Sequence, residues 1–173
     1  MTLRSLTLAA LTAAAVALPL LSLGGCGFAP LYAQTGVVSN LAAIDVVAPE
    51  GRTGFLLRQS LDDAFAKNRS VPASYRMTLA LAEARYPRGI RIDNVATRYE
   101  YVLTANYKLA ALPSGALAKK GTVRVELTYD SADQPYASIS AQQDAQQRGA
   151  EEAARRIQLE LAAWLATGAK PKA

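Results

Sequence analysis

Three stretches in the middle of the chain alternate apolar and polar residues, which is typical of strands with one buried face. They span residues 75–86, 95–110 and 123–129, and the turn-forming run Pro113-Ser114-Gly115 separates the last two. Strands that follow one another this closely pair most simply as antiparallel neighbours. The pattern therefore predicts an antiparallel meander with one apolar and one polar face.

Two other stretches repeat apolar residues at helical spacing. The first runs from Thr53, a predicted N-cap, to about Lys67, with Leu57 on its apolar face. The second covers residues 150–165, and the alanine- and glutamine-rich sequence before it extends the helix back towards Tyr136. Both patterns predict amphipathic helices that cover an apolar surface.

A short β-branched run at residues 44–47 adds a fourth strand, so the predicted order is β-α-β-β-β-α. We therefore predict an α+β fold, a two-layer sandwich with a mostly antiparallel four-stranded sheet and two helices on one face. The short strand could pair at either edge. The domain is expected over residues 41–168, after a tether at 26–40 and before a flexible tail at 169–173.

The N-terminus has the composition of a targeting segment. Arg4 is its only charge, and an alanine- and leucine-rich apolar stretch follows over residues 6–23 before two glycines. A charged start, an apolar middle and small residues at the end are typical of a secretory signal, which we place at residues 1–25. The alternative is a transmembrane helix, but its length would be near the lower limit and Pro19 would interrupt it.

The segment Leu23-Gly24-Gly25-Cys26 resembles the lipobox of bacterial lipoprotein signals. The resemblance implies cleavage between Gly25 and Cys26, followed by acylation of the Cys26 thiol and of the new amine. Several acyl chains together hold a protein stably on a membrane. Gly27 stands where an Asp would retain a lipoprotein in the inner membrane, so we expect the outer membrane. The alternative for Cys26 is an ordinary buried or free thiol.

Composition removes several kinds of chemistry. The chain has no His and one Cys, which excludes Ser-His-Asp triads, Cys-His pairs, imidazole metal sites and internal disulfides. It has no Gly-x-Ser-x-Gly, Walker or Rossmann pattern. We expect a protein that is not an enzyme and that carries no cofactor or metal, only the acyl chains on Cys26.

Basic residues concentrate in the predicted sheet. Residues 76–124 hold nine Lys or Arg and three Asp or Glu, against a net charge of +5 for the whole chain. Such a cluster suggests an anionic partner, although a solvated strand face that resists edge pairing gives the same pattern. The polar face cannot lie against lipid, but it would suit the polar lumen of a large barrel.

Consecutive hairpin turns lie at opposite ends of a sheet, so one compact anion cannot easily reach both. We place the candidate ligand site at the first turn. Its arginines are Arg85, Arg88, Arg91 and Arg98. Lys119 and Lys120, at the second turn, become a separate patch or simply solvated residues.

After the predicted cleavage site the chain reads Cys26-Gly27-Phe28-Ala29-Pro30-Leu31-Tyr32. This start resembles that of the LptE family of lipopolysaccharide-assembly lipoproteins, whose pattern is Cys-Gly-Phe-x-Pro-Leu-Tyr, and the predicted order of elements also matches. The residues that match the motif are Cys26, Gly27, Phe28, Pro30, Leu31 and Tyr32.

The resemblance implies an outer-membrane lipoprotein that partners the LptD β-barrel. It would act as plug and assembly factor, on the periplasmic side or within the barrel lumen, in the transport of lipopolysaccharide to the cell surface. Lipopolysaccharide is also an implied ligand, because its phosphates could pair with the candidate arginines. The alternative is an accessory lipoprotein of another periplasmic lipid transporter or of a secretion pore. A nucleic-acid module is disfavoured, because export removes that ligand.

Overall fold

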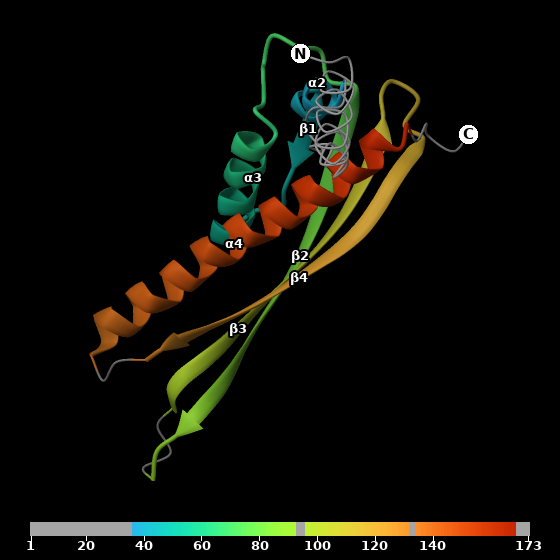
Figure 1. Ribbon diagram of the computed structural model, residues 1–173. Helices are drawn as coiled ribbons and strands as arrows, with labels where there is room; N and C mark the ends of the chain where they lie inside the picture. The colour runs from blue at the N-terminus through green and yellow to red at the C-terminus, as the bar shows by residue number, and fades with distance from the viewer. Residues whose placement is uncertain (1–35, 93–95, 132–133, 169–173) are drawn as a thin grey trace, which may run out of the picture. The chain divides into compact units, whose positions relative to one another are not determined.

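The computed structural model describes residues 36–92, 96–131 and 134–168 (Figure 1). In chain order, its elements are α2 (Val37–Ala42), β1 (Ile44–Val47), α3 (Arg52–Ala64), β2 (Tyr75–Ile90), β3 (Ala96–Ala111), β4 (Leu117–Asp130) and α4 (Pro135–Ala166).

The four strands form one sheet in the order β1-β2-β3-β4. β2, β3 and β4 are an antiparallel meander, while β1 runs parallel to β2, with Ile44 beside Tyr75. A parallel neighbour needs a crossover connection, which α3 supplies. The predicted α+β fold with a mostly antiparallel sheet is confirmed, and β1 pairs at the β2 edge.

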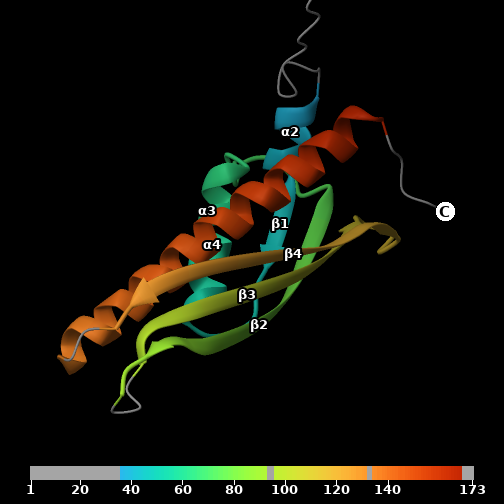
Figure 2. The same ribbon diagram turned by 60° about the horizontal axis from the view of Figure 1, so that its bottom comes forward.

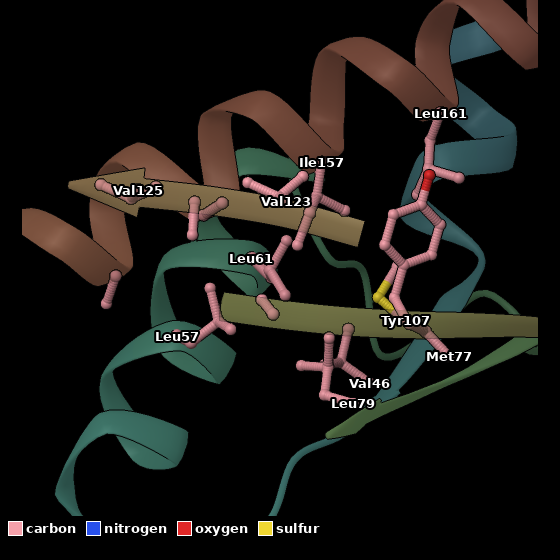
Figure 3. Packing of buried hydrophobic residues seen from close by; sticks show 14 of the residues in the cluster. Val46, Leu57, Leu61, Met77, Leu79, Tyr107, Val123, Val125, Ile157 and Leu161 are labelled. Carbon is pink, nitrogen blue, oxygen red and sulfur yellow. The ribbon is translucent and has the colours of Figure 1, made fainter. Parts of the chain in front are cut away.

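Helices α3 and α4 cover the same face of the sheet, as the two views in Figures 1 and 2 show. Period-two alternation sends every second side chain of the strands towards these helices. The resulting core joins both layers (Figure 3). Its labelled members are Val46, Leu57, Leu61, Met77, Leu79, Tyr107, Val123, Val125, Ile157 and Leu161. Burying each such aliphatic side chain contributes roughly 1.5–3 kcal/mol to folding.

Helix α4 approaches the sheet closely because its buried face carries small residues. A Cβ added to Gly149 would lie 2.9 Å from Cε1 of Tyr101, so glycine leaves room for the ring. Alanines continue the same face. The buried ones are Ala145, Ala150, Ala153, Ala154 and Ala162.

The start of α3 differs from the sequence prediction. Thr53 is not the N-cap, because the helix begins at Arg52 and Gly51 takes the cap position with a φ of 111°. Glycine adopts that backbone conformation without steric cost. Thr53 instead lies in the first helical turn and is buried, with 3% of its surface exposed.

The expected tether also differs from the structure over residues 37–40, which belong to α2. Val37 and Leu41 of this short helix are buried in the core. The strands are longer than predicted at their ends, and β2 continues to Ile90. The far part of the β2–β3 hairpin extends past α3 (Figure 1), and β2 has no buried residue from Glu83 to Ile90.

Candidate functional site

The predicted lipidation site and family motif belong to the N-terminal part of the chain that lies outside the described residues. They comprise Cys26, Gly27, Phe28, Pro30, Leu31 and Tyr32, with Gly25 before the cleavage point. Gly36 is the first described residue, and α2 starts one residue later. The candidate ligand arginines, by contrast, all lie within the described residues.

Arg85 lies on the helix-covered face of the sheet. Its Nη1 is 2.7 Å from Oε1 of Gln142 on α4, and its guanidinium carbon lies 4.8 Å from the centre of the Tyr99 ring. Tyr99 in turn stacks on Tyr129, with 5.6 Å between the ring centres. Arg85 therefore joins α4 to the sheet through a hydrogen bond and a cation–π contact.

Arg88 and Arg98 lie on the opposite, open face of the sheet. They are direct cross-strand partners on β2 and β3. Each is paired with a carboxylate: Nε of Arg88 is 2.9 Å from Oε2 of Glu100, and Nε of Arg98 is 2.8 Å from Oδ1 of Asp130. These carboxylates offset the repulsion that two like charges directly opposite each other would otherwise produce.

The hairpin tip adds apolar side chains to this basic end. Arg91 is exposed between Ile90, which is 61% exposed, and Ile92, which is fully exposed. The arginines were predicted as ligand residues from their charge, and the two isoleucines were not predicted as part of the site. The sequence does indicate the isoleucines, because apolar residues next to a turn and outside the core pattern indicate a contact surface.

The four candidate arginines therefore do not form a single cluster. Arg88 and Arg98 are brought together on the open face, and Arg91 lies just beyond the end of β2. Arg85 is separated from them by the sheet itself. Period two predicts this division, because Arg85 shares its parity with Met77 and Leu79, whose side chains are buried.

A second basic group lies at the other end of the sheet. Lys108 and Lys120 are direct cross-strand partners on β3 and β4, while Lys119 is the partner of the buried Leu109 and therefore belongs to the other face of the sheet. Within the described ranges, none of these three lysines forms an ion pair. Lys108 was not predicted as a member of this group. The sequence does indicate it: Lys108 and Lys120 lie equally far from Ser114, so a hairpin that turns there places them opposite each other.

The open face is polar and largely charge-paired. Besides the two pairs at Arg88 and Arg98, it carries Arg76 with Asp45 at 3.2 Å and Arg124 with Glu126 at 2.7 Å. Exposed pairs contribute about 0–1 kcal/mol each to stability. Their larger effect is on partner choice, because this face suits water or a polar wall and cannot lie against lipid tails.

Two buried tyrosines donate hydrogen bonds to carboxylates at the edge of the core. The Tyr101 hydroxyl donates to Oε2 of Glu83 at 2.7 Å, and the Tyr107 hydroxyl donates to Oε2 of Glu160 at 2.6 Å. Burial, followed by the hydrogen bond to the carboxylate, raises the pKa of both phenols well above the usual value. Both groups are neutral donors at physiological pH.

The described surface has shallow grooves. A groove of about 380 Å³ lies between α3 and α4, lined by polar residues such as Gln59 and Gln158. A second groove, of about 540 Å³, lies between α2 and the loop after α3. Among the described residues, no group of three or more His, Cys, Asp or Glu side chains is placed to hold a metal ion. None of the described helices is both long enough and apolar enough to cross a membrane.

Comparison with known proteins identifies the family. The model of the LptE family, described as lipopolysaccharide-assembly, matches residues 41–161. A search of the curated proteins gave no match.

Solved structures share the fold. A crystal structure from Caulobacter crescentus CB15 is 52% identical over 80% of this chain and 100% of that chain, with a TM-score of 0.67. The rare lipoprotein B from Shewanella oneidensis is 13% identical over 72% and 95%, with a TM-score of 0.55. The lipoprotein B from Nitrosomonas europaea is 14% identical over 72% and 84%, with a TM-score of 0.53.

The family match spans every strand of the sheet and both helices that cover it, from the end of α2 to Leu161 in α4. It agrees with the layered fold and with the predicted lipoprotein start of the chain. This protein belongs to the LptE family of lipopolysaccharide-assembly lipoproteins.

Proposed function

We propose that this lipoprotein is anchored in the outer membrane through acyl chains on Cys26 and partners an LptD-like β-barrel. It acts there as plug and assembly factor for the transport of lipopolysaccharide to the cell surface. The family match supports the assembly role. Gly27, in place of an Asp after the acylated Cys, supports the outer membrane.

The open face of the sheet supports a position against the barrel's inner wall. The lumen of a large outer-membrane barrel is polar. The part of this face whose charges are paired, as between Arg124 and Glu126, meets such a wall without burying an unpaired charge, whereas Lys108 and Lys120 lie nearer the second hairpin turn. On the opposite face, α3 and α4 already cover the apolar side chains, so no apolar sheet face remains to be buried by the barrel.

The tip of the β2–β3 hairpin is the proposed lipopolysaccharide contact, and one observation carries this assignment. Arg88 and Arg91 lie within a few residues of the exposed side chains of Ile90 and Ile92. Guanidinium groups bind phosphate oxygens, while isoleucines contact acyl chains. An amphiphilic ligand with both groups matches this alternation better than a purely anionic one. Arg85, held by Gln142 and Tyr99, serves the fold in this proposal.

The test of the barrel partnership is an affinity purification of the tagged, full-length protein from detergent-solubilised membranes, followed by mass spectrometry. We expect a large outer-membrane barrel at near-equal stoichiometry. An inner-membrane transporter or a secretin at that stoichiometry would contradict the proposal. The same lysate with an untagged chain provides the background.

A further inference from the structure

One end of the domain collects the start of the described chain, the second hairpin turn and the end of α4. Figures 1 and 2 both show α2 and the end of α4 at this end. Tyr75 at the start of β2 is the register partner of Ile44 and of Ala111, and the amide of Leu112 donates to the Ser74 carbonyl at 2.9 Å. The Trp164 ring of α4 contacts the Tyr75 ring, with 5.9 Å between ring centres. We call this the anchor end.

The second hairpin turn, the loop after α3 and the end of α4 carry no acidic residues, while β1 at the same end carries Asp45, which pairs with Arg76 at 3.2 Å. Residues 64–76, 101–125 and 161–168 have no Asp or Glu. They supply Arg69 in the loop after α3, together with Lys108, Lys119 and Lys120. Glu160 is the next carboxylate along α4, and it accepts the hydrogen bond of Tyr107. The anchor end therefore has a positive surface without a carboxylate paired to its lysines.

The pairing of Lys108 with Lys120 is the least expected part of this surface. Like charges directly opposite each other on neighbouring strands destabilise a sheet. At the other end of the same face, Arg88 and Arg98 have the same relationship, but Glu100 and Asp130 compensate them. The lysine pair has no such partner in the described part of the chain. An external anion would provide the missing compensation.

Exposed apolar side chains lie on other elements of the anchor end. Val38 and Val71 are 50% and 40% exposed and line the 540 Å³ groove between α2 and the loop after α3. Leu117, at the start of β4, is 48% exposed. Basic side chains beside exposed aliphatic ones are characteristic of surfaces that lie on a membrane, where the cations meet headgroups and the aliphatic groups enter the interface.

We propose that the anchor end is a membrane-contact surface, in which Lys108 and Lys120 bind the phosphates of anionic phospholipids in the leaflet that holds the Cys26 acyl chains. This inference rests on the proposed anchoring at Cys26. Nine residues separate Cys26 from Gly36, and they can span at most about 30 Å. An anchor at that distance does not by itself determine which end of the domain faces the lipid, whereas the lysines would.

The size of the effect follows from surface electrostatics. A Lys near an anionic leaflet strengthens association about fivefold, and salt screens this attraction within about a Debye length. Two neutralised lysines should therefore reduce the membrane-facing population markedly in anionic vesicles. They should have no effect in vesicles of neutral lipid.

Trp164, the single tryptophan of the chain, is a built-in probe at the anchor end. The lipidated, processed protein is reconstituted into phosphatidylcholine vesicles with or without 30% phosphatidylglycerol, each carrying a headgroup spin-labelled phosphatidylcholine. We expect stronger quenching of Trp164 fluorescence with phosphatidylglycerol, and loss of that difference at high salt. The Lys108→Gln/Lys120→Gln variant should lose the difference. Thermal melts confirm that each variant is folded.

The matched control is Arg52→Gln/Arg58→Gln, which removes the same charge from exposed positions on α3. It should keep the difference in quenching. Equal quenching of the wild type in both lipids, or an unchanged difference in the lysine variant, would overturn the proposal. Amine labelling of Lys108 and Lys120 provides a further test. Labelling that a co-purified barrel blocks and that lipid vesicles do not block would assign the surface to a protein partner and overturn the proposal.

Failure of the anchoring gives a different result. A protein that lacks acyl chains would not float with pure phosphatidylcholine vesicles. The lysine surface is then tested by flotation with phosphatidylglycerol vesicles, which should still be lost in the lysine variant and kept in the arginine control. Absence of flotation with either lipid would overturn both proposals.

Discussion

Tyr107 lies across Gly121 on the neighbouring strand, so closely that a Cβ at residue 121 would be 2.4 Å from the tyrosine hydroxyl oxygen. The ring crosses the glycine on its way to α4, where the hydroxyl donates to Glu160. A glycine in a strand usually weakens it. Here, its missing side chain lets a buried tyrosine connect the sheet to the helix.

Gly121→Ala is therefore expected to destabilise the domain by roughly 1–3 kcal/mol, because the ring cannot give way without leaving its hydrogen bond. Chemical denaturation monitored by far-UV circular dichroism measures the change. The penalty should largely disappear in a Tyr107→Leu background, where the ring is gone. An equal penalty in both backgrounds would show that the ring does not cause it.

Stability is expected to fall as the pH rises above about 10. An unfolded tyrosine titrates near 10.0, whereas burial raises the pKa of Tyr101 and Tyr107 in the folded state. The folded state then binds more protons than the unfolded one, so each tyrosine lowers stability by up to about 1.4 kcal/mol per pH unit above that value.

Phenolate absorbance during an alkaline titration tests this prediction. Two of the eight tyrosines should titrate only when the protein unfolds. Tyr107→Phe should reduce that late group to one and make the decrease of stability with pH less steep. If all tyrosines titrate together near pH 10 while circular dichroism stays native, the buried phenols are not protected.

Charge reversal at the hairpin tip is expected to weaken lipopolysaccharide binding. Arg88→Glu with Arg91→Glu should lower affinity about tenfold or more, since charge-assisted hydrogen bonds contribute about 1.5–3 kcal/mol each. Lys119→Glu with Lys120→Glu should have a smaller effect, because those residues lie at the other end of the sheet. Calorimetry with purified lipopolysaccharide measures both. Equal losses would contradict the assignment to the tip.

Glu100→Gln is expected to have the opposite effect and to strengthen lipopolysaccharide binding. Glu100 accepts hydrogen bonds from Arg88 and competes with an incoming phosphate. Glu126→Gln is the control, because that carboxylate lies on the same face but pairs with Arg124. Binding that is unchanged in Glu100→Gln, or strengthened equally in the control, would remove Arg88 from the proposed contact.

Cys26→Ala is expected to abolish acylation and membrane attachment, because the only thiol of the chain is lost. Growth with labelled palmitate followed by immunoprecipitation measures incorporation, and carbonate extraction measures attachment. Arg58→Gln, an exposed position on α3 outside the signal that keeps the thiol, serves as the control. Label that persists in Cys26→Ala would show that acylation occurs elsewhere.

The sheet was predictable because the alternation of apolar and polar residues along its strands indicates which side chains are buried. Residues 44–47 were predicted as a strand and form β1. The partner of β1 was left open, since pairing in the plane of a sheet leaves no periodic signal. Helix α2 was missed because Val37, Val38 and Asn40 are weak helix formers, and tertiary burial of Val37 and Leu41 decides the outcome.

The place of the candidate arginines on the hairpin was predictable, but their contacts were not. Proximity in sequence correctly placed Arg88 and Arg98 at one turn, yet their carboxylate partners depend on the register. Trp164, within the predicted C-terminal helix, is only half-buried and packs edge-on against Tyr75. Helix periodicity gives the face of a residue, but not how far the sheet extends beneath it.

The parallel attachment of β1 has a consequence for the order in which the domain folds. The meander forms from neighbouring segments, whose short loops close quickly, while β1 must wait for β2 and for the α3 crossover between them. We therefore expect the hairpins to form first and β1, with α2 beside it, to join last. The part of the domain that follows the proposed acylation site in the sequence would thus be the last to close.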